Sequence, residues 1–264
     1  MKNPITWIVL VLGLAGVAVI VYYNWYRQGP EPQPQLPVPA ETKPAPEIKA
    51  EPKIQYPIAE SGEAKPLPAL SESDAAVQKA LAGPIGQKAL AEFFYLNEII
   101  RRIVATVDNL PREKVSQRLM PVKPVAGKFL VTGDEDNLVL NPANYSRYAP
   151  YVKLAEAVNV KQLVAVYVHF YPLFQQAYKD LGYPSGYFND RLVQVIDHLL
   201  AAPDVQGPVK LVQPSVMYQF ADHELEALSA GQKIMVRIGA KNAARIKAKL
   251  KEYRSELTSQ EFKQ

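Results

Sequence analysis

The chain has 264 residues, a formal net charge of +4 and no cysteine. The absence of cysteine excludes disulfide bonds, thiolate metal sites and a cysteine nucleophile. The small positive charge gives no argument for nucleic-acid binding, which normally needs a strongly basic surface.

The first predicted element is a membrane-spanning helix over Ile5–Tyr23, which reads ITWIVLVLGLAGVAVIVYY and carries no charge. About 20 apolar residues in a helix span the hydrocarbon core of a bilayer. A cleaved signal peptide is the alternative, but the length of the apolar region and the lack of a small-residue cleavage site argue against it. We therefore expect residues 1–28 to be a signal anchor. Aromatic residues flank it, as is typical of membrane interfaces: Trp7, Tyr22, Tyr23, Trp25 and Tyr26.

The charges beside this segment favour neither orientation strongly, since Lys2 lies on one side and Arg27 on the other. A short N-terminal tail is readily retained in the cytoplasm. We therefore expect a single-pass protein of the bacterial inner (cytoplasmic) membrane whose soluble domain lies in the periplasm. The inverted topology is the alternative.

Residues 29–69 form a predicted tether that is rich in proline, glutamate and lysine. It holds 11 of the chain's 23 prolines. Proline fixes φ and removes a backbone donor, so regular helix or sheet is not expected. We predict a disordered, semi-extended linker that lifts the following domain away from the bilayer.

Residues 70–258 are predicted to fold into one mainly α-helical globular domain with a small β-hairpin, followed by a disordered tail over residues 259–264. About 190 residues can bury one hydrophobic core. The hairpin is predicted at Lys128–Leu140 and an extended segment at Val209–Phe220. Apolar periodicity and cap residues predict helices from Ser71 or Ser73 to Ala82 and over residues 87–109, 141–159, 160–181, 190–202 and 233–257, with short helices after Pro111 and Asp222.

The stretch Tyr167–Pro203 is expected to be the core helix pair of this domain, because it is the densest in tyrosine and phenylalanine. Within it, Pro172 predicts a kink in a long helix. Gly182 predicts the end of that helix. Asn189 predicts the N-cap of the next helix.

Three stretches carry a resemblance to a known family: RRIVATVDNL at Arg101–Leu110, HFYPLFQQAYKDLGYP at His169–Pro184 and FNDRLVQVIDHLLAAP at Phe188–Pro203. Together they resemble a bacterial family known as domain of unknown function 3014. The resemblance covers most of residues 70–257. It implies a domain placed after a membrane helix and a proline-rich stretch, and it implies no activity, substrate, cofactor or catalytic residue.

A candidate ligand cleft is predicted around the Gly182–Gly186 loop, which would fold two helices toward each other. Tyrosine offers a flat face and a hydroxyl group, which suits sugars and peptides. The alternative is that these tyrosines edge the core and that the charged residues form an ordinary helix surface. The candidate residues are His169, Tyr171, Tyr178, Tyr183, Tyr187, Asp190 and Arg191, with Asp197 and His198 nearby.

A basic stripe follows the last predicted helix at i+4 spacing. Such a stripe would suit anionic lipid, nucleic acid or an acidic partner, and an ordinary solvated face is the alternative. The stripe comprises Lys233, Arg237, Lys241, Arg245 and Lys249, of which the last three are the candidate contacts with an anionic surface.

The residue spacing predicts no metal site and no cofactor. The histidines His169, His198 and His223 lack metal-binding spacing, and neither a phosphate-binding loop nor a nucleophile elbow occurs. Asp134 and Asp136 have the chemistry of calcium ligands, but their loop lacks the length and the later glutamate of an EF-hand.

We therefore interpret the chain as a cell-envelope protein whose tethered helical domain is a binding or scaffold module rather than an enzyme. Its expected partners are the cytoplasmic membrane, through Ile5–Tyr23, and an envelope protein or the cell wall. Nucleic acid is not expected outside the cytoplasm. The alternative is a peptidoglycan-binding or wall-modifying domain that uses the tyrosine cleft. A glycosidase-like carboxylate pair, Glu92 or Glu98 with Asp190, also stays open.

Overall fold

The computed structural model describes residues 53–58, 66–134 and 137–259. The predicted membrane segment Ile5–Tyr23, most of the predicted tether and residues 260–264 lie outside these ranges. Within them, no helix combines the length and the apolar character needed to cross a bilayer.

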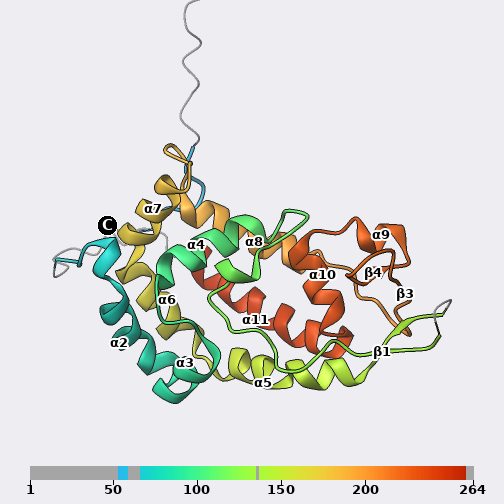
Figure 1. The fold of residues 1–264 in the computed structure, drawn as a ribbon. Coiled ribbons are helices and arrows are strands. Elements are labelled where there is room, and N and C mark those ends of the chain that lie inside the picture. The colour runs from blue at the N-terminus through green and yellow to red at the C-terminus, as the bar shows by residue number, and fades with distance from the viewer. Residues whose placement is uncertain (1–52, 59–65, 135–136, 260–264) are drawn as a thin grey trace, which may run out of the picture. The chain divides into compact units, whose positions relative to one another are not determined.

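The described part of the chain is mainly α-helical, as predicted, and contains ten α-helices (Figure 1). The helices are α2 (Asp74–Ile85), α3 (Gln87–Phe93), α4 (Ile99–Asn109), α5 (Ala143–Ala157), α6 (Val160–His169), α7 (Tyr171–Asp180), α8 (Phe188–Leu200), α9 (His223–Glu226), α10 (Ala230–Arg237) and α11 (Ala240–Thr258). Short 3₁₀ turns occur at Leu70–Glu72 and Gln117–Leu119.

Two antiparallel hairpins accompany the helices and lie at the end of the domain opposite α2 (Figure 1). The predicted hairpin is confirmed as β1 (Val131–Thr132) paired with β2 (Val139–Leu140). The predicted extended segment folds into a second hairpin of β3 (Leu211–Val212) and β4 (Gln219–Phe220). The Leu140 amide donates to the Val209 carbonyl at 2.9 Å, so the two hairpins are joined.

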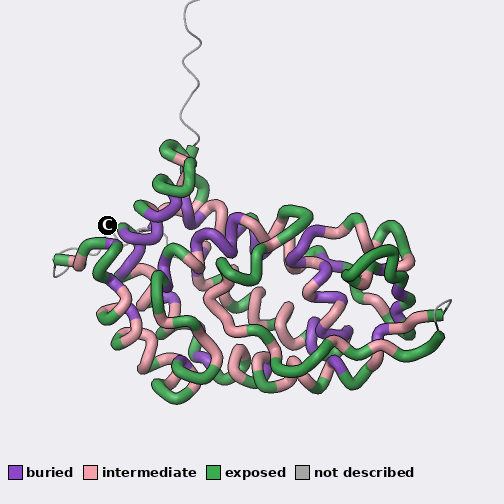
Figure 2. The backbone as a smooth tube through the Cα atoms, viewed as in Figure 1, coloured by how far each residue is buried: buried purple, intermediate pink, exposed green. Residues whose placement is uncertain are grey.

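The main hydrophobic core lies where α4 packs against α7 and α8, with α2 and α6 beside them. Phe188 at the start of α8 is fully buried, and Ile100 and Val104 of α4 are each 1% exposed. The long helix α11 packs across α5, α6 and α8. Figure 2 shows the buried backbone concentrated in these packed helices. The stretch expected to be the core helix pair therefore does supply much of the core.

The prediction of one continuous helix over residues 87–109 is wrong, because residues 94–98 are not helical and separate α3 from α4. Phe94 is extended, and the Tyr95 amide donates to the Pro121 carbonyl at 2.8 Å. Helix α4 begins after Glu98, which has a positive φ of 51°. The Asp74 carboxylate accepts the Glu98 and Ile99 amides at 2.7 and 2.9 Å. A cap supplied from 25 residues away overrides the local apolar periodicity.

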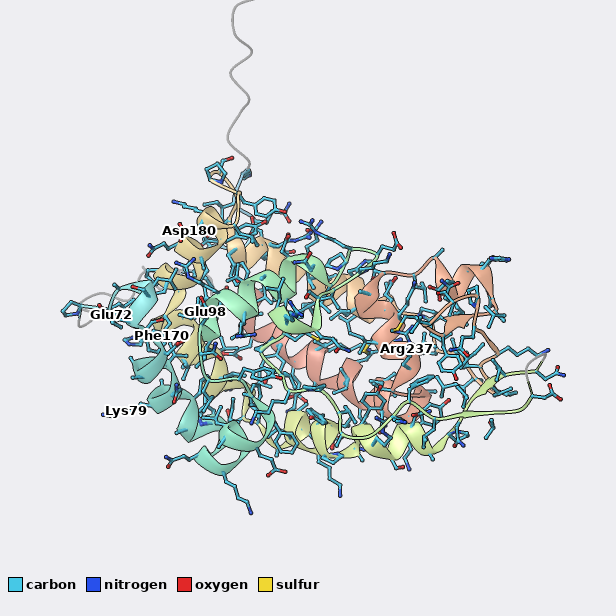
Figure 3. The ribbon with its side chains drawn as sticks, in the orientation of Figure 1. Glu72, Lys79, Glu98, Phe170, Asp180 and Arg237 are labelled. Atoms are coloured by element: carbon cyan, nitrogen blue, oxygen red, sulfur yellow. The ribbon has the colours of Figure 1, made fainter. Side chains whose placement is uncertain are left out.

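The helix predicted over residues 160–181 is also two helices, which meet at Phe170 (Figure 3). Pro172 lies in the first turn of α7, where a missing N–H costs no intrahelical hydrogen bond. It therefore starts a helix instead of kinking one. Gly182 ends α7 with a φ of 115°, as predicted.

Other predicted helix boundaries shift for similar local reasons. Helix α2 continues through Pro84 to Ile85, and α5 is continuous through Pro150. Asn189 does not cap α8, because α8 begins at Phe188, two residues earlier than predicted, and the cap position is Tyr187. The helix predicted at residues 233–257 is divided at Gly239 into α10 and α11.

The short helix predicted after Pro111 is replaced by a long irregular loop with a single 3₁₀ turn. Side chains of neighbouring helices hold its backbone. Thr106 donates to the Leu119 carbonyl at 3.1 Å, and Arg147 donates to the Gly127 carbonyl at 2.7 Å. Figure 2 shows this loop as largely exposed or half-buried.

Replacing Gly239 with alanine is expected to destabilise the domain by about 2 kcal/mol, because its φ of 84° and ψ of 150° suit glycine almost alone. An added Cβ would also lie 2.7 Å from the Tyr145 ring. The measurement is the midpoint of urea unfolding. Gly83→Ala is the matched control. It lies inside α2, and no atom other than those of its chain neighbours and helix backbone is within 4 Å of the added Cβ; the gain in helix propensity and the restriction by Pro84 oppose each other, so stability should change by less than about 0.5 kcal/mol. An unchanged midpoint for Gly239→Ala would contradict this account.

Candidate functional site

The structure distributes the residues of the predicted cleft over two groups of contacts. Tyr178, Tyr183 and Arg191 belong to a cluster around a buried carboxylate. Tyr187 and Asp190 contact residues 53–58 of the predicted tether. Tyr171 is buried beside Tyr187, with ring centroids 5.4 Å apart. His169 is exposed at the end of α6, against the ring of Phe170.

The first group surrounds Asp108 of α4, which is 2% exposed. Arg112 and the Tyr183 hydroxyl donate to its Oδ2 at 2.6 and 3.1 Å. Arg191 Nη2 donates to the Asp108 carbonyl at 2.9 Å and lies 3.2 Å from Oδ1. A buried carboxylate is tolerated when cations and hydrogen bonds compensate its lost hydration. This cluster therefore joins α4 to α8 and to the α7–α8 loop.

A pair of stacked rings covers one side of this cluster. The Tyr178 and Tyr183 rings are 4.6 Å apart and nearly parallel. Burial raises the pKa of Tyr178, so its hydroxyl stays protonated at neutral pH. The sequence pointed to these tyrosines but not to Asp108, whose partners Tyr183 and Arg191 lie 75 and 83 residues away.

The second group binds a segment that we assigned to the tether. Asp190 accepts two successive main-chain amides of this segment, those of Gln55 at 3.0 Å and Tyr56 at 2.8 Å, one on each carboxylate oxygen. Hydrogen bonds to an ionised carboxylate are stronger than those between neutral groups. Residues 53–58 are thus held on α8, although their composition led us to assign them to the predicted disordered linker.

Two neighbours of Asp190 continue the same recognition. Asn189 Nδ2 donates to the Tyr56 carbonyl at 2.8 Å, and the Ile58 amide donates to the Tyr187 hydroxyl at 2.7 Å. The Tyr167 hydroxyl donates to Asn189 Oδ1 at 3.1 Å. Burial raises the pKa of Tyr167 well above its ordinary value, so this hydroxyl keeps its proton and orients the Asn189 amide. We call Tyr187, Asn189 and Asp190 the docking site.

Apolar contacts anchor the same segment. Tyr56 packs on a cluster from α6, α8 and α11 that includes Val160, Val193 and Leu257. Ile58 is 8% exposed and belongs to the main core. Full burial of such a side chain contributes on the order of 1.5–3 kcal/mol. A sequence signal was present, because Ile54, Tyr56 and Ile58 alternate within a tract that is otherwise mostly proline and charge.

A serine–histidine pair also lies near the Asp108 cluster. Ser229 Oγ is 2.7 Å from His198 Nε2 and caps α10 by accepting the Gln232 amide. Such a pair can activate a serine nucleophile if backbone amides are available to hold an oxyanion. The two amides that follow, those of Ala230 and Gly231, instead donate to the carbonyls of Arg112 and Leu110, just after α4, at 2.7 and 2.8 Å. The pair therefore joins the start of α10 to α8, and the two amides join it to the segment that follows α4.

The family model of the protein of unknown function DUF3014 matches residues 99–254, from the start of α4 to most of α11. The chain belongs to this family. No curated protein and no solved structure gives a significant match. The DUF3014 region contains the Asp108 cluster and the docking site, whereas residues 53–58 precede it.

The predicted basic stripe is not a continuous face in this DUF3014 domain, because Gly239 interrupts the helix that would carry it. Lys241 is exposed on α11. The other members have partners: Lys233 pairs with Glu226 and Arg245 with Glu156, Lys249 pairs with Glu252, and Arg237 lies over the Phe220 ring.

The described residues include no group of three His, Asp or Glu side chains placed to hold a metal ion. Asp134 accepts the Asn137 amide at 3.0 Å, and Asp136 lies outside the described ranges. The Asp190 carboxylate, which we considered as half of a glycosidase-like pair, is engaged by two main-chain amides.

Replacing Asp108 with alanine is expected to lower the free energy of unfolding by about 3–5 kcal/mol, because Arg191 would lose its buried counter-charge. Chemical denaturation measures the loss. Asp180→Ala is the matched control. Asp180 pairs with Arg101 at 3.5 Å, both side chains are more than 40% exposed, and its removal should cost less than about 1 kcal/mol. Equal losses in the two variants would refute the special role of Asp108.

His198 is expected to make stability fall as the pH drops. Burial first, and then the charge of Arg191, lower the pKa of its imidazole in the folded state. Below pH 6.5 the unfolded chain therefore binds more protons than the folded one, and the stability present above that pH is lost as the pH falls. The measurement compares melting temperatures from pH 7.5 to 5 for the unmodified chain and His198→Gln. The unmodified chain should lose more, and identical slopes would contradict the assignment.

Proposed function

We propose that the DUF3014 domain of this chain is a binding module for a short polypeptide segment, held at the cell envelope by the N-terminal anchor and tether. The observation that carries the proposal is the set of four hydrogen bonds between the docking site and main-chain groups of residues 55–58. In peptide recognition, hydrogen bonds to the main chain commonly give affinity and pockets for the side chains give specificity.

Contacts that do not involve residues 53–58 help to hold the docking site. Its three side chains come from the cap and first turn of one helix, α8. Tyr167 orients Asn189, and the following residue Arg191 is held by Asp108. A rigid site loses little conformational entropy on binding, so more of the contact energy appears as affinity. This favours a binding role for the site.

The predicted topology gives the module a place of action. An anchor at Ile5–Tyr23 and a proline-rich linker would present the domain in the periplasm, away from the bilayer. An envelope protein is then the expected partner. The domain would act as a scaffold or interaction module without catalysis of its own.

The peptidoglycan alternative is less favoured because the tyrosine hydroxyls are already engaged within the domain. Tyr183 contacts Asp108 and Arg112, and Tyr171 donates to Gln175 at 3.0 Å. Burial raises the pKa of Tyr171 strongly, so it remains a neutral donor. A sugar would have to displace these partners, whereas a peptide already occupies the site beside Tyr187.

The proposal is tested by supplying the segment in trans. The probe is a fluorescein-labelled synthetic peptide of residues 51–61, EPKIQYPIAES. The protein is the full chain with Tyr56→Asp and Ile58→Asp, which removes both apolar anchors from the chain's own segment. We expect saturable binding by fluorescence anisotropy, and at least about tenfold weaker binding to the unmodified chain, whose own segment competes at millimolar effective concentration.

Two phenylalanine variants of the vacated chain provide the matched control. Tyr187→Phe should weaken peptide binding about fivefold, because it removes the acceptor of the Ile58 amide. Tyr183→Phe should leave the affinity unchanged while lowering stability, because its hydroxyl serves Asp108. A folded vacated chain that does not bind the peptide would refute the proposed function.

A further inference from the structure

We infer that the docking site selects a short sequence, an aromatic residue followed by proline and an aliphatic residue, and that Tyr56-Pro57-Ile58 of the tether is its resident ligand. This inference rests on the proposed function and names the class of polypeptide that the site takes. Its occupant from outside the chain is a segment of another polypeptide with this sequence.

The pattern of main-chain contacts explains the proline. The amides of residues 55, 56 and 58 are each accepted by a side chain of the docking site. Pro57 has no N–H, so the site needs no acceptor at that position. Any other residue there would bring a donor that has to find a partner. Proline also restricts the backbone of its own position and of the preceding residue before binding, which lowers the entropy cost of ordering the segment.

The aromatic preference follows from the surroundings of Tyr56. Its ring packs on aliphatic side chains of three helices, where a small polar residue would leave apolar surface unfilled. Arg254 is close enough for Tyr56 to contribute to the raised pKa of its guanidinium, after the larger effect of Asp197. Arg254 holds Asp197 at 2.5 Å, so the guanidinium is fixed in place. We therefore expect tyrosine to bind best and phenylalanine to be tolerated.

The aliphatic preference follows from the burial of Ile58. Its side chain is 8% exposed within the main core. A polar or charged side chain there would lose its hydration among the apolar side chains that surround Ile58. In contrast, Lys53, Ile54 and Gln55 are exposed, and Ile54 is 47% exposed. The selection is therefore confined to residues 56–58, and the residues before them contribute only their main chain.

The resident segment also sets a threshold for outside ligands. A segment on the same chain competes at an effective concentration in the millimolar range. A partner must therefore bind the vacated site much more tightly than the resident segment, or be present at many copies nearby. This makes the tether a regulator of the site as well as a spacer.

A series of single substitutions in the labelled peptide tests the selection on the vacated full chain. Tyr56→Ser and Ile58→Asn should each weaken binding at least about 20-fold, and Pro57→Ala about fivefold. Tyr56→Phe and Ile58→Val should stay within about fivefold of the parent peptide. The matched controls are Lys53→Ala and Ile54→Ala, which alter exposed side chains and should change the affinity less than about twofold.

The outcomes separate the two claims. If the parent peptide binds and every substitution stays within about twofold of it, the selection is wrong while the peptide site stands. If the parent peptide does not bind, the proposed function fails and the inference falls with it.

A second measurement avoids the vacated variant: in the full chain, Ile58→Asn should speed hydrogen exchange at the amides of residues 55 and 56 at least about tenfold, and Ile54→Ala should not. Equal exchange in the two variants would overturn the selection.

Discussion

The buried carboxylate of Asp108 is the constraint on which the arrangement of this domain depends. It binds Arg191 of α8 from α4, and it also engages Arg112 and the Tyr183 hydroxyl. Arg191 directly follows Asp190, so the same turn of α8 holds the core on one side and the tether segment on the other. A shift of α8 would break the Asp108 contacts and misplace the docking site together. The stability of the fold and the geometry of the site are therefore coupled through one helix turn.

Tertiary contacts explain why the predicted cleft residues take part in two sets of contacts. Asp190 and Arg191 are consecutive on α8, yet Asp190 accepts amides of residues 55 and 56, whereas Arg191 binds Asp108. The tyrosine-rich stretch was correctly singled out as the centre of the domain, and Tyr187 and Asp190 do meet a segment from elsewhere in the chain. What the sequence did not reveal was which face each residue takes, because that depends on Asp108 and on residues 53–58.

The existence and type of most helices followed from apolar periodicity, whereas the interruptions did not. The break before α4 depends on Asp74, and the extended Phe94 pairs with Val122. Both are tertiary contacts that no local pattern contains. Gly239 did carry a local signal, but the apolar stripe on either side of it favoured one continuous helix. For the tether, the composition averaged over 41 residues indicated a disordered linker. That average concealed residues 53–58, in which Tyr56 and Ile58 supply the apolar side chains that a docked segment needs.

Docking of residues 53–58 on the domain would affect the length of chain that links the domain to the proposed anchor. Under the proposed topology, docking of Tyr56 and Ile58 would attach the linker to the domain at residue 53. Displacement of residues 53–58 by an outside segment would then add at least these six residues to the linker, on the order of 20 Å of extended chain. The domain of such an anchored protein would reach farther from the membrane only when a partner is bound. A partner fixed to a distant layer of the envelope would be favoured over one close to the bilayer, because the first uses the added length and the second does not. The sequence of the tether and the chemistry of α8 would thus set together which partners the module can hold.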